Sequence, residues 1–77
     1  MDLRETFAQN LRRLRNARGL SQDALAYEAG ISRSYLSQLE KGKFYVSIKV
    51  IAKLAEVLKT DAAEFLKANP KKARIGA

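Results

Sequence analysis

The segment Ser21–Glu40 (SQDALAYEAGISRSYLSQLE) constrains the fold more than any other part of this 77-residue chain. Ser21 and Ser32 each precede a helical pattern, and serine is a preferred N-cap because its hydroxyl accepts a free backbone N–H. Gly30 separates the two patterns and can adopt the left-handed backbone that a sharp turn requires. Ala26 is small enough for two helices to cross closely. The segment therefore predicts two short helices joined by a tight turn.

The second of these helices is polar at its start and along its outward face. Leu36 and Leu39 point to the core, which leaves an outward face of Arg33, Ser34, Ser37 and Gln38. Arginine can pair two-pronged with guanine, glutamine with adenine, and serine with either base. The start of a helix also directs backbone N–H groups at phosphate. Such a pair is typical of a helix-turn-helix, whose second helix enters the major groove of DNA.

Apolar residues at helical spacing predict three further helices. One spans residues 3–18, another runs from the Ser47 cap to about Lys59, and the last runs from Asp61 to Asn69-Pro70. Asp61 and Glu64 approximate a capping box at the start of the last helix. No segment alternates polar and apolar residues with a period of two, so we expect no sheet. The chain is therefore predicted to be an all-α domain of five helices over residues 1–69, with a basic tail over residues 70–77.

The same spacing identifies the side chains that should form the core. The first helix contributes Leu3, Phe7, Leu11 and Leu14. The helix pair contributes Leu25, Ala26, Ala29, Leu36 and Leu39. The last two helices contribute Ile48, Ile51, Leu54, Ala55, Leu58, Phe65 and Leu66.

The fourth helix is apolar over a wider arc than one core contact requires. We assign the edge that carries Val50, Leu54 and Val57, together with Phe65 of the fifth helix, to a homodimer interface. The alternative is that the fifth helix covers this whole surface within one chain. A two-fold dimer would place its recognition helices about one DNA turn apart, roughly 34 Å.

The composition excludes several classes of function. There is no cysteine and no histidine, so disulfides, thiolate chemistry and the usual zinc sites are excluded. The sequence also lacks a glycine-rich phosphate loop and clustered carboxylates, so we expect no enzyme activity, metal or cofactor. Fifteen basic and eight acidic residues give a net charge of +7, which suits a polyanionic partner. No apolar run approaches the ~20 residues that span a bilayer and no signal peptide is evident, so we expect a cytoplasmic protein without a membrane partner.

Four stretches of the sequence carry a resemblance to a known family: LRRLRNARGLSQ, LAYEAGIS, YLSQLEKGK and SIKVIAKLAEVL. They are similar to the lambda-repressor-like, or XRE, family of DNA-binding domains. The resemblance implies that Gln22 binds phosphate, and that Arg33, Ser34 and Gln38 read bases with Ser37 beside them. It also implies a structural ion pair between Arg15 and Glu40, for which we expect no DNA contact.

A narrower resemblance is carried by SRSYLSQLEKGK and SIKVIAKL. These stretches are similar to the controller proteins of restriction–modification systems, small dimers that have Arg-Thr-Tyr where this chain has Arg33-Ser34-Tyr35. The segment Phe44-Tyr45-Val46 departs from the arginine-asparagine that is common in controllers.

Several residues beside the recognition helix have two interpretations. Ser32 is first a helix cap and only secondarily a phosphate contact. Tyr35 either packs its ring against the second helix or directs its hydroxyl to a phosphate. Lys41, Lys43 and Tyr45 can grip the DNA backbone, which adds affinity but no sequence information.

Two hypotheses for function follow. The first is a sequence-specific, homodimeric transcriptional regulator that binds double-stranded DNA at a pseudo-palindromic operator, with control of a restriction–modification system as the narrower expectation. The alternative is an antitoxin-type module whose main partner is another protein. A protein partner would be RNA polymerase under the first hypothesis and a toxin under the second.

Overall fold

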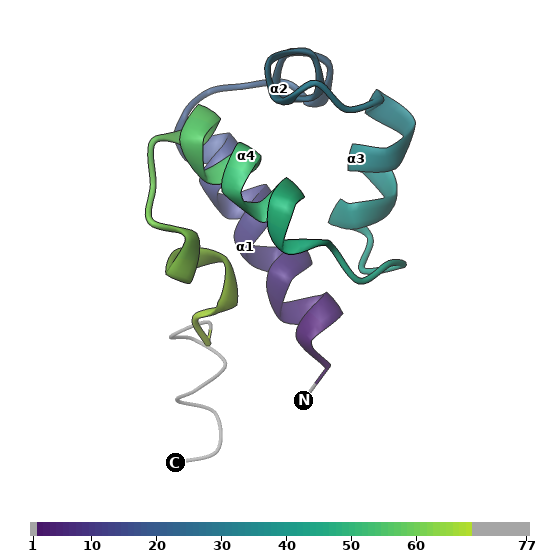
Figure 1. Ribbon diagram of the computed structural model, residues 1–77, viewed down its shortest axis with the longest axis vertical. Coiled ribbons are helices and arrows are strands. Elements are labelled where there is room, and N and C mark those ends of the chain that lie inside the picture. Colours follow the sequence, from purple (N-terminus) through teal and green to yellow (C-terminus); the bar gives the residue numbers. More distant parts are fainter. Residues whose placement is uncertain (1, 69–77) are drawn as a thin grey trace.

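The computed structural model describes residues 2–68 and contains four α-helices and one 3₁₀-helix in that range (Figure 1). The helices are α1 (Leu3–Ala17), α2 (Gln22–Ala29), α3 (Arg33–Glu40), α4 (Ile48–Leu58) and η1 (Ala62–Leu66). Residues 2–68 contain no strand, so the predicted all-α class is confirmed. In Figure 1, α4 crosses in front of α1, while α2 and α3 lie together on one side and η1 on the other.

The predicted serine caps start three of the helices. Ser21 Oγ accepts the N–H of Ala24 at 3.0 Å, and Ser47 Oγ accepts that of Val50 at 3.2 Å. Gly30 ends α2 with a φ of 71°, and the N–H of the following residue, Ile31, returns to the carbonyl of Ala26 at 3.0 Å. A left-handed glycine with this returning bond is the usual stop for a helix. The short helix pair and its sharp turn are therefore confirmed.

The fifth predicted helix is a single short 3₁₀-helix rather than a helix that continues to Asn69-Pro70. Asp61 accepts the N–H of Ala63 at 3.2 Å, and Glu64 pairs with Lys67 at 2.9 Å instead of completing a capping box. The buried amide of Asn10 on α1 donates to the carbonyls of Phe65 at 2.8 Å and Lys67 at 2.9 Å. This contact takes up carbonyls at the end of η1. Asn69-Pro70 and the predicted tail lie outside the described residues.

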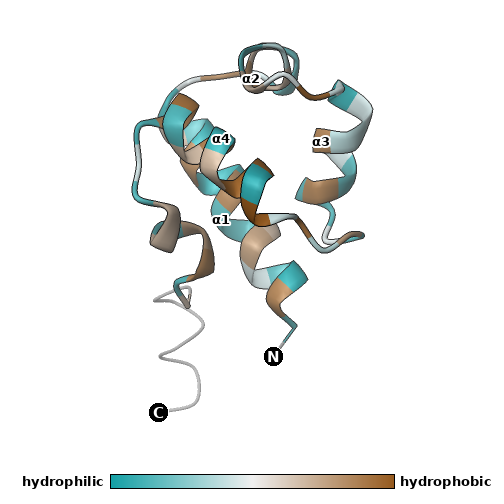
Figure 2. Cartoon of the chain, viewed as in Figure 1, coloured by the Kyte–Doolittle hydropathy of each residue, from teal (hydrophilic) through white to brown (hydrophobic). Residues whose placement is uncertain are grey.

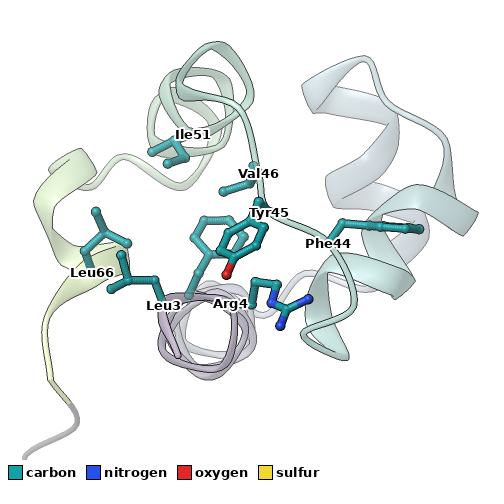
Figure 3. A pocket seen from close by; sticks show the side chains of 8 residues that line it. Leu3, Arg4, Phe44, Tyr45, Val46, Ile51 and Leu66 are labelled. Carbon is teal, nitrogen blue, oxygen red and sulfur yellow. The ribbon is translucent and has the colours of Figure 1, made fainter. Parts of the chain in front are cut away.

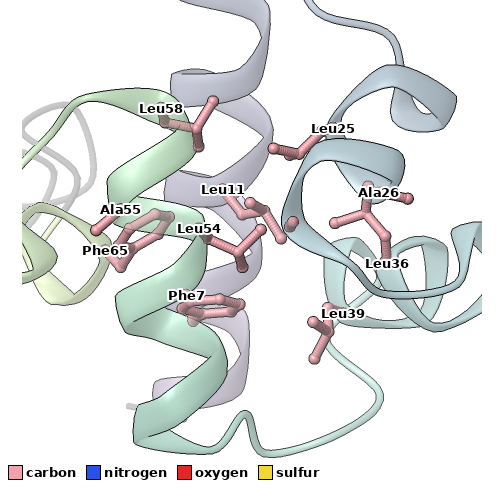
Figure 4. Close-up of a cluster of buried hydrophobic side chains, with 11 residues drawn as sticks. Phe7, Leu11, Leu25, Ala26, Leu36, Leu39, Leu54, Ala55, Leu58 and Phe65 are labelled. Atoms are coloured by element: carbon pink, nitrogen blue, oxygen red, sulfur yellow. The ribbon is translucent and has the colours of Figure 1, made fainter.

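The core lies where all five elements meet, as Figure 4 shows. Its buried apolar side chains are Phe7, Leu11, Leu25, Ala26, Ala29, Leu36, Leu39, Leu54, Ala55, Leu58 and Phe65. The rings of Phe7 and Phe65 lie with centroids 5.3 Å apart, which joins η1 to α1. Most of the predicted core is therefore confirmed.

Three predicted core residues are exposed instead. Leu3 is 54%, Ile48 85% and Leu66 47% accessible to solvent. Leu3 and Ile48 are the first residues of their helices and Leu66 is the last of η1, so each extends past the elements that would cover it. Helical spacing identifies the direction of an apolar face, but it does not say where the opposing element ends.

The predicted dimer interface needs a correction at two of its four residues. Leu54 and Phe65 are completely buried within the chain, so neither side chain has surface to offer a second copy. For these two residues the alternative is right, because η1 covers α4 inside one molecule. Val50 and Val57 are half-buried against the core and retain some exposed surface.

Candidate nucleic-acid interface

The outward side of α3 gathers the polar residues that the sequence predicted to face DNA. Arg33 and Ser34 are exposed, Ser37 and Gln38 are half-buried, and all four line one depression in the surface. Figure 2 shows hydrophilic colours on the side of α3 that faces away from the rest of the molecule. The arrangement follows from Leu36 and Leu39, which are fully buried on the opposite side of the helix.

The start of α3 also carries the predicted cap and an unpredicted ion pair. Ser32 Oγ accepts the N–H of Tyr35 at 3.0 Å, so its first role is structural. Arg33 Nε lies 3.5 Å from Asp23 Oδ1, which comes from the first turn of α2. Asp23 lies where negative charge favours the start of a helix. Nothing in the local pattern pairs it with Arg33, because the distance depends on how α2 and α3 cross.

Tyr35 contacts a residue that neither interpretation of the sequence named. Its ring stacks on that of Phe44, with centroids 6.4 Å apart and planes inclined by 26°. Phe44 belongs to the loop between α3 and α4 and remains half exposed. The ring of Tyr35 therefore packs on this loop and against the core, and the phosphate contact of its hydroxyl stays a prediction.

The same loop is attached to α1 through its next residue. The guanidinium of Arg4 lies over the Tyr45 ring at 4.6 Å from the centroid. Figure 3 shows Phe44 directed toward α3 and Tyr45 directed toward α1. Arg4 also donates to Asp2 at 2.8 Å, and this hydrogen bond holds the pKa of the Asp2 carboxyl below its ordinary value. The loop that presents Lys41 and Lys43, both exposed, is thus anchored on two sides.

The ion pair implied by the resemblance is present and nearly buried. Arg15 Nε lies 2.6 Å from Glu40 Oε2, and the side chains are 14% and 4% accessible to solvent. Arg15 also donates to the carbonyl of Leu20 at 2.8 Å, and Arg12 donates to the backbone carbonyl of Glu40. Sequence reasoning missed Arg12. The network joins α1, the turn after it and the end of α3, so Arg15 and Glu40 are structural.

Gln22, the predicted phosphate contact, belongs to this network. Its amide Nε2 donates to Glu40 Oε1 at 3.0 Å, which links the first residue of α2 to the last residue of α3. Its backbone N–H lies in the first turn of α2, where helix amides are free to bind an anion. The phosphate contact of Gln22 stays a prediction.

Two other features of the described chain bear on function. No helix within residues 2–68 is long and apolar enough to cross a membrane. The same residues contain no group of three or more side chains of the kinds that hold a metal ion.

The fold and this surface define a helix-turn-helix protein, and residues 11–65 match the family described as Helix-turn-helix. The chain belongs to this lambda-repressor-like family and is a DNA-binding transcription regulator. It is 35% identical over 66 residues to the control protein C.SmaI of Serratia marcescens, an alignment that covers 86% of this chain and 79% of that one.

Solved structures of two relatives have the same fold. The restriction–modification controller protein C.AhdI from Aeromonas hydrophila is 44% identical with a TM-score of 0.78, over 80% of this chain and 94% of that chain. The hypothetical transcription factor NHTF from Neisseria is 31% identical with a TM-score of 0.86, over 96% and 85% of the two chains.

Proposed function

We propose that this protein reads a specific DNA operator with the outward face of α3. The observation that carries the proposal is the group of Arg33, Ser34, Ser37 and Gln38 around one surface depression. Their side chains are the types that hydrogen-bond base edges in the major groove. Gln22, Lys41 and Lys43, with Ser32 and Tyr35 beside them, would contact the phosphate backbone. Such contacts set the position of the protein but carry no sequence information.

We propose that this protein controls a restriction–modification system. The similarity to C.SmaI and to C.AhdI, at 35% and 44% identity, supports this narrower assignment. Phe44 and Tyr45 occupy the loop position at which controllers commonly have arginine and asparagine. The stacking of Phe44 on Tyr35 and of Tyr45 under Arg4 indicates that this loop has an anchoring role here.

The active form is proposed to be a homodimer on a pseudo-palindromic operator. A chain of this size has a small core, which typically supplies only ~3–5 kcal/mol of stability without a further stabilising element. Ile48 on α4 is 85% accessible, and Leu3 and Leu66 are each about half exposed. We propose that these exposed apolar residues, with Val50 or Val57 at the other edge of α4, provide the contact between copies. A cytoplasmic location and the absence of enzyme activity complete the proposal.

The antitoxin alternative remains weaker than transcription regulation. The relatives described above are named as control proteins or as a transcription factor, which favours transcription regulation. A small protein that co-purifies with the chain in a fixed ratio would reverse this preference.

The experiment that tests the proposal is selection of bound sequences from a random DNA pool, followed by competition assays with two variants. Arg33→Ala should lose discrimination at particular base pairs, because a two-pronged arginine–guanine contact contributes ~1–3 kcal/mol of specificity. Lys43→Ala should weaken binding to all sequences alike and reduce the slope of log K against log salt by about 0.9, since one phosphate contact is lost. The second variant serves as the control for the first.

Two results would overturn this proposal. One is a selected pool without any enriched sequence, which would leave only non-specific binding. The other is an Arg33→Ala variant that keeps the operator preference of the parent protein, which would show that the start of α3 does not read bases.

A further inference from the structure

An acidic side chain lies on the surface that is proposed to approach DNA. Asp23 is 78% accessible and Arg33, the first residue of α3, is 63% accessible, yet their charged groups lie 3.5 Å apart. A carboxylate near DNA repels phosphate, so its position beside the proposed base reader needs a reason. Its place in the first turn of α2 favours the start of that helix, but the exposed ion pair with Arg33 contributes only a little more to folding stability.

The geometry of the pair leaves Arg33 able to bind a base. The closest approach is from Nε of Arg33 to Oδ1 of Asp23, on the side of the guanidinium nearest the aliphatic stem. Within residues 2–68, the two terminal nitrogens of Arg33 donate no hydrogen bond. A guanidinium has five N–H donors in a fixed plane, so one edge can face a carboxylate while the terminal nitrogens face the O6 and N7 of a guanine.

A restrained arginine is a better reader than a mobile one. The side chain of arginine loses considerable rotamer entropy when it is held in a single geometry. A carboxylate that already limits its orientation in the free protein reduces the entropy still to be lost on binding. The carboxylate of Asp23 also repels the phosphate backbone of any DNA. In the operator complex, the intact pair with Arg33 partly neutralises this charge and so weakens the repulsion.

We propose that Asp23 is a positioning residue that orients Arg33 and thereby raises the ratio of operator binding to non-specific binding. This inference rests on the proposed function, because it requires that Arg33 reads a base. It assigns to α2 a part in sequence discrimination through a residue that does not itself contact a base.

The test compares Asp23→Asn with a matched control on the same helix. Glu28 is also exposed, and Glu28→Gln removes the same charge without touching Arg33. For Asp23→Asn the ratio of operator to non-specific affinity should fall about fivefold, a part of what one arginine–guanine contact contributes. For Glu28→Gln both affinities should rise slightly and together, so the ratio should stay unchanged. Thermal unfolding of the two variants checks that both keep the fold.

A double-mutant cycle separates this inference from the proposed function. In an Arg33→Ala background, Asp23→Asn should leave the specificity ratio unchanged, because its effect acts through Arg33. If Asp23→Asn and Glu28→Gln alter the ratio equally, or if Asp23→Asn raises it, the inference is wrong while base reading by Arg33 can still hold. If Arg33→Ala by itself leaves the ratio unchanged, the proposed function fails first.

Discussion

Two charged residues at opposite ends of α3 have opposite roles. Arg33 at the start of the helix is exposed, and within residues 2–68 its ion-pair partner is the also exposed Asp23 at 3.5 Å, which leaves the guanidinium accessible to DNA. Glu40 at the end is 3% accessible and accepts hydrogen bonds from the side chains of Arg15 and Gln22. A buried carboxylate needs such partners, because an unpaired charge in the interior is very costly.

Substitution of Glu40 should therefore destabilise the protein severely. In Glu40→Ala the guanidinium of Arg15 stays largely buried without its partner, and breaking a buried pair in this way typically costs about 3–5 kcal/mol. Urea unfolding monitored by circular dichroism measures the change in the free energy of unfolding. The control is Glu56→Ala, whose carboxylate is 76% accessible and should change stability by less than about 0.5 kcal/mol. Equal losses in the two variants would contradict a structural role for the Arg15–Glu40 pair.

At the scale of the elements, η1 is held in place by two side chains of α1. The buried Asn10 amide donates to two carbonyls at the end of this five-residue helix, and Phe65 packs its ring on Phe7. A 3₁₀-helix of this length has few bonds of its own. The length and position of η1 therefore depend on tertiary contacts. Helical spacing in the sequence does not contain those contacts, so it predicted a longer element.

Asn10→Ala should loosen η1 more than the rest of the domain. Loss of the amide leaves two carbonyls without their donor, and such a loss costs about 1–3 kcal/mol when the groups stay buried. Hydrogen exchange should show reduced protection in η1 and in the part of α4 that it covers. Asn16→Ala, an exposed position on the same helix, is the control. Uniform loss of protection across α2 and α3 as well would contradict a local role for Asn10.

The loop between α3 and α4 is another element that the tertiary structure defines. Its aromatic residues are attached in two directions, Phe44 to Tyr35 on α3 and Tyr45 to Arg4 on α1. Figure 3 shows Phe44 and Tyr45 pointing in different directions from adjacent positions of one loop. The sequence indicated only that this segment departs from the family pattern. In the structure, two aromatic contacts hold this loop in place.

At the scale of the whole molecule, the exposed apolar residues lead to a prediction about assembly. Ile48 is 85% accessible, so Ile48→Lys should not disturb the core, but it would place a charge in the proposed contact between copies. We expect sedimentation velocity to show a monomer under conditions in which the parent protein is a dimer. Tyr27→Lys, at a residue on α2 that is 86% accessible, should leave the dimer intact. A parent protein that is itself monomeric would refute the homodimer.

Much of the architecture could be predicted from local chemistry. The serines at 21, 32 and 47 begin helices because a cap needs only a hydroxyl within reach of the next free N–H groups. Gly30 ends α2 because only glycine adopts its backbone without strain. The outward face of α3 follows from Leu36 and Leu39, whose spacing fixes which side is buried.

Other features depend on which elements meet, and no local pattern contains that information. Leu54 and Phe65 were predicted to face a partner, but they are buried because η1 covers α4 within the chain. Ile48 was predicted to be buried, but it is exposed because no element within residues 2–68 covers the start of α4. Apolar residues have the same helical spacing whether a neighbouring element covers them or not, so spacing alone cannot distinguish a buried residue from an exposed one.

The segment Ser21–Glu40 contains both kinds of information. Its capping serines, its glycine turn and its alternation of buried and polar positions are set by interactions within a few residues, so the sequence alone was sufficient to identify a helix-turn-helix. The pairing of Asp23 with Arg33 and of Gln22 with Glu40 brings together residues from two helices. Those contacts are decided by the crossing of α2 and α3 on the common core, because a separation of 3 Å between side chains depends on the position of whole helices rather than on their order in the chain.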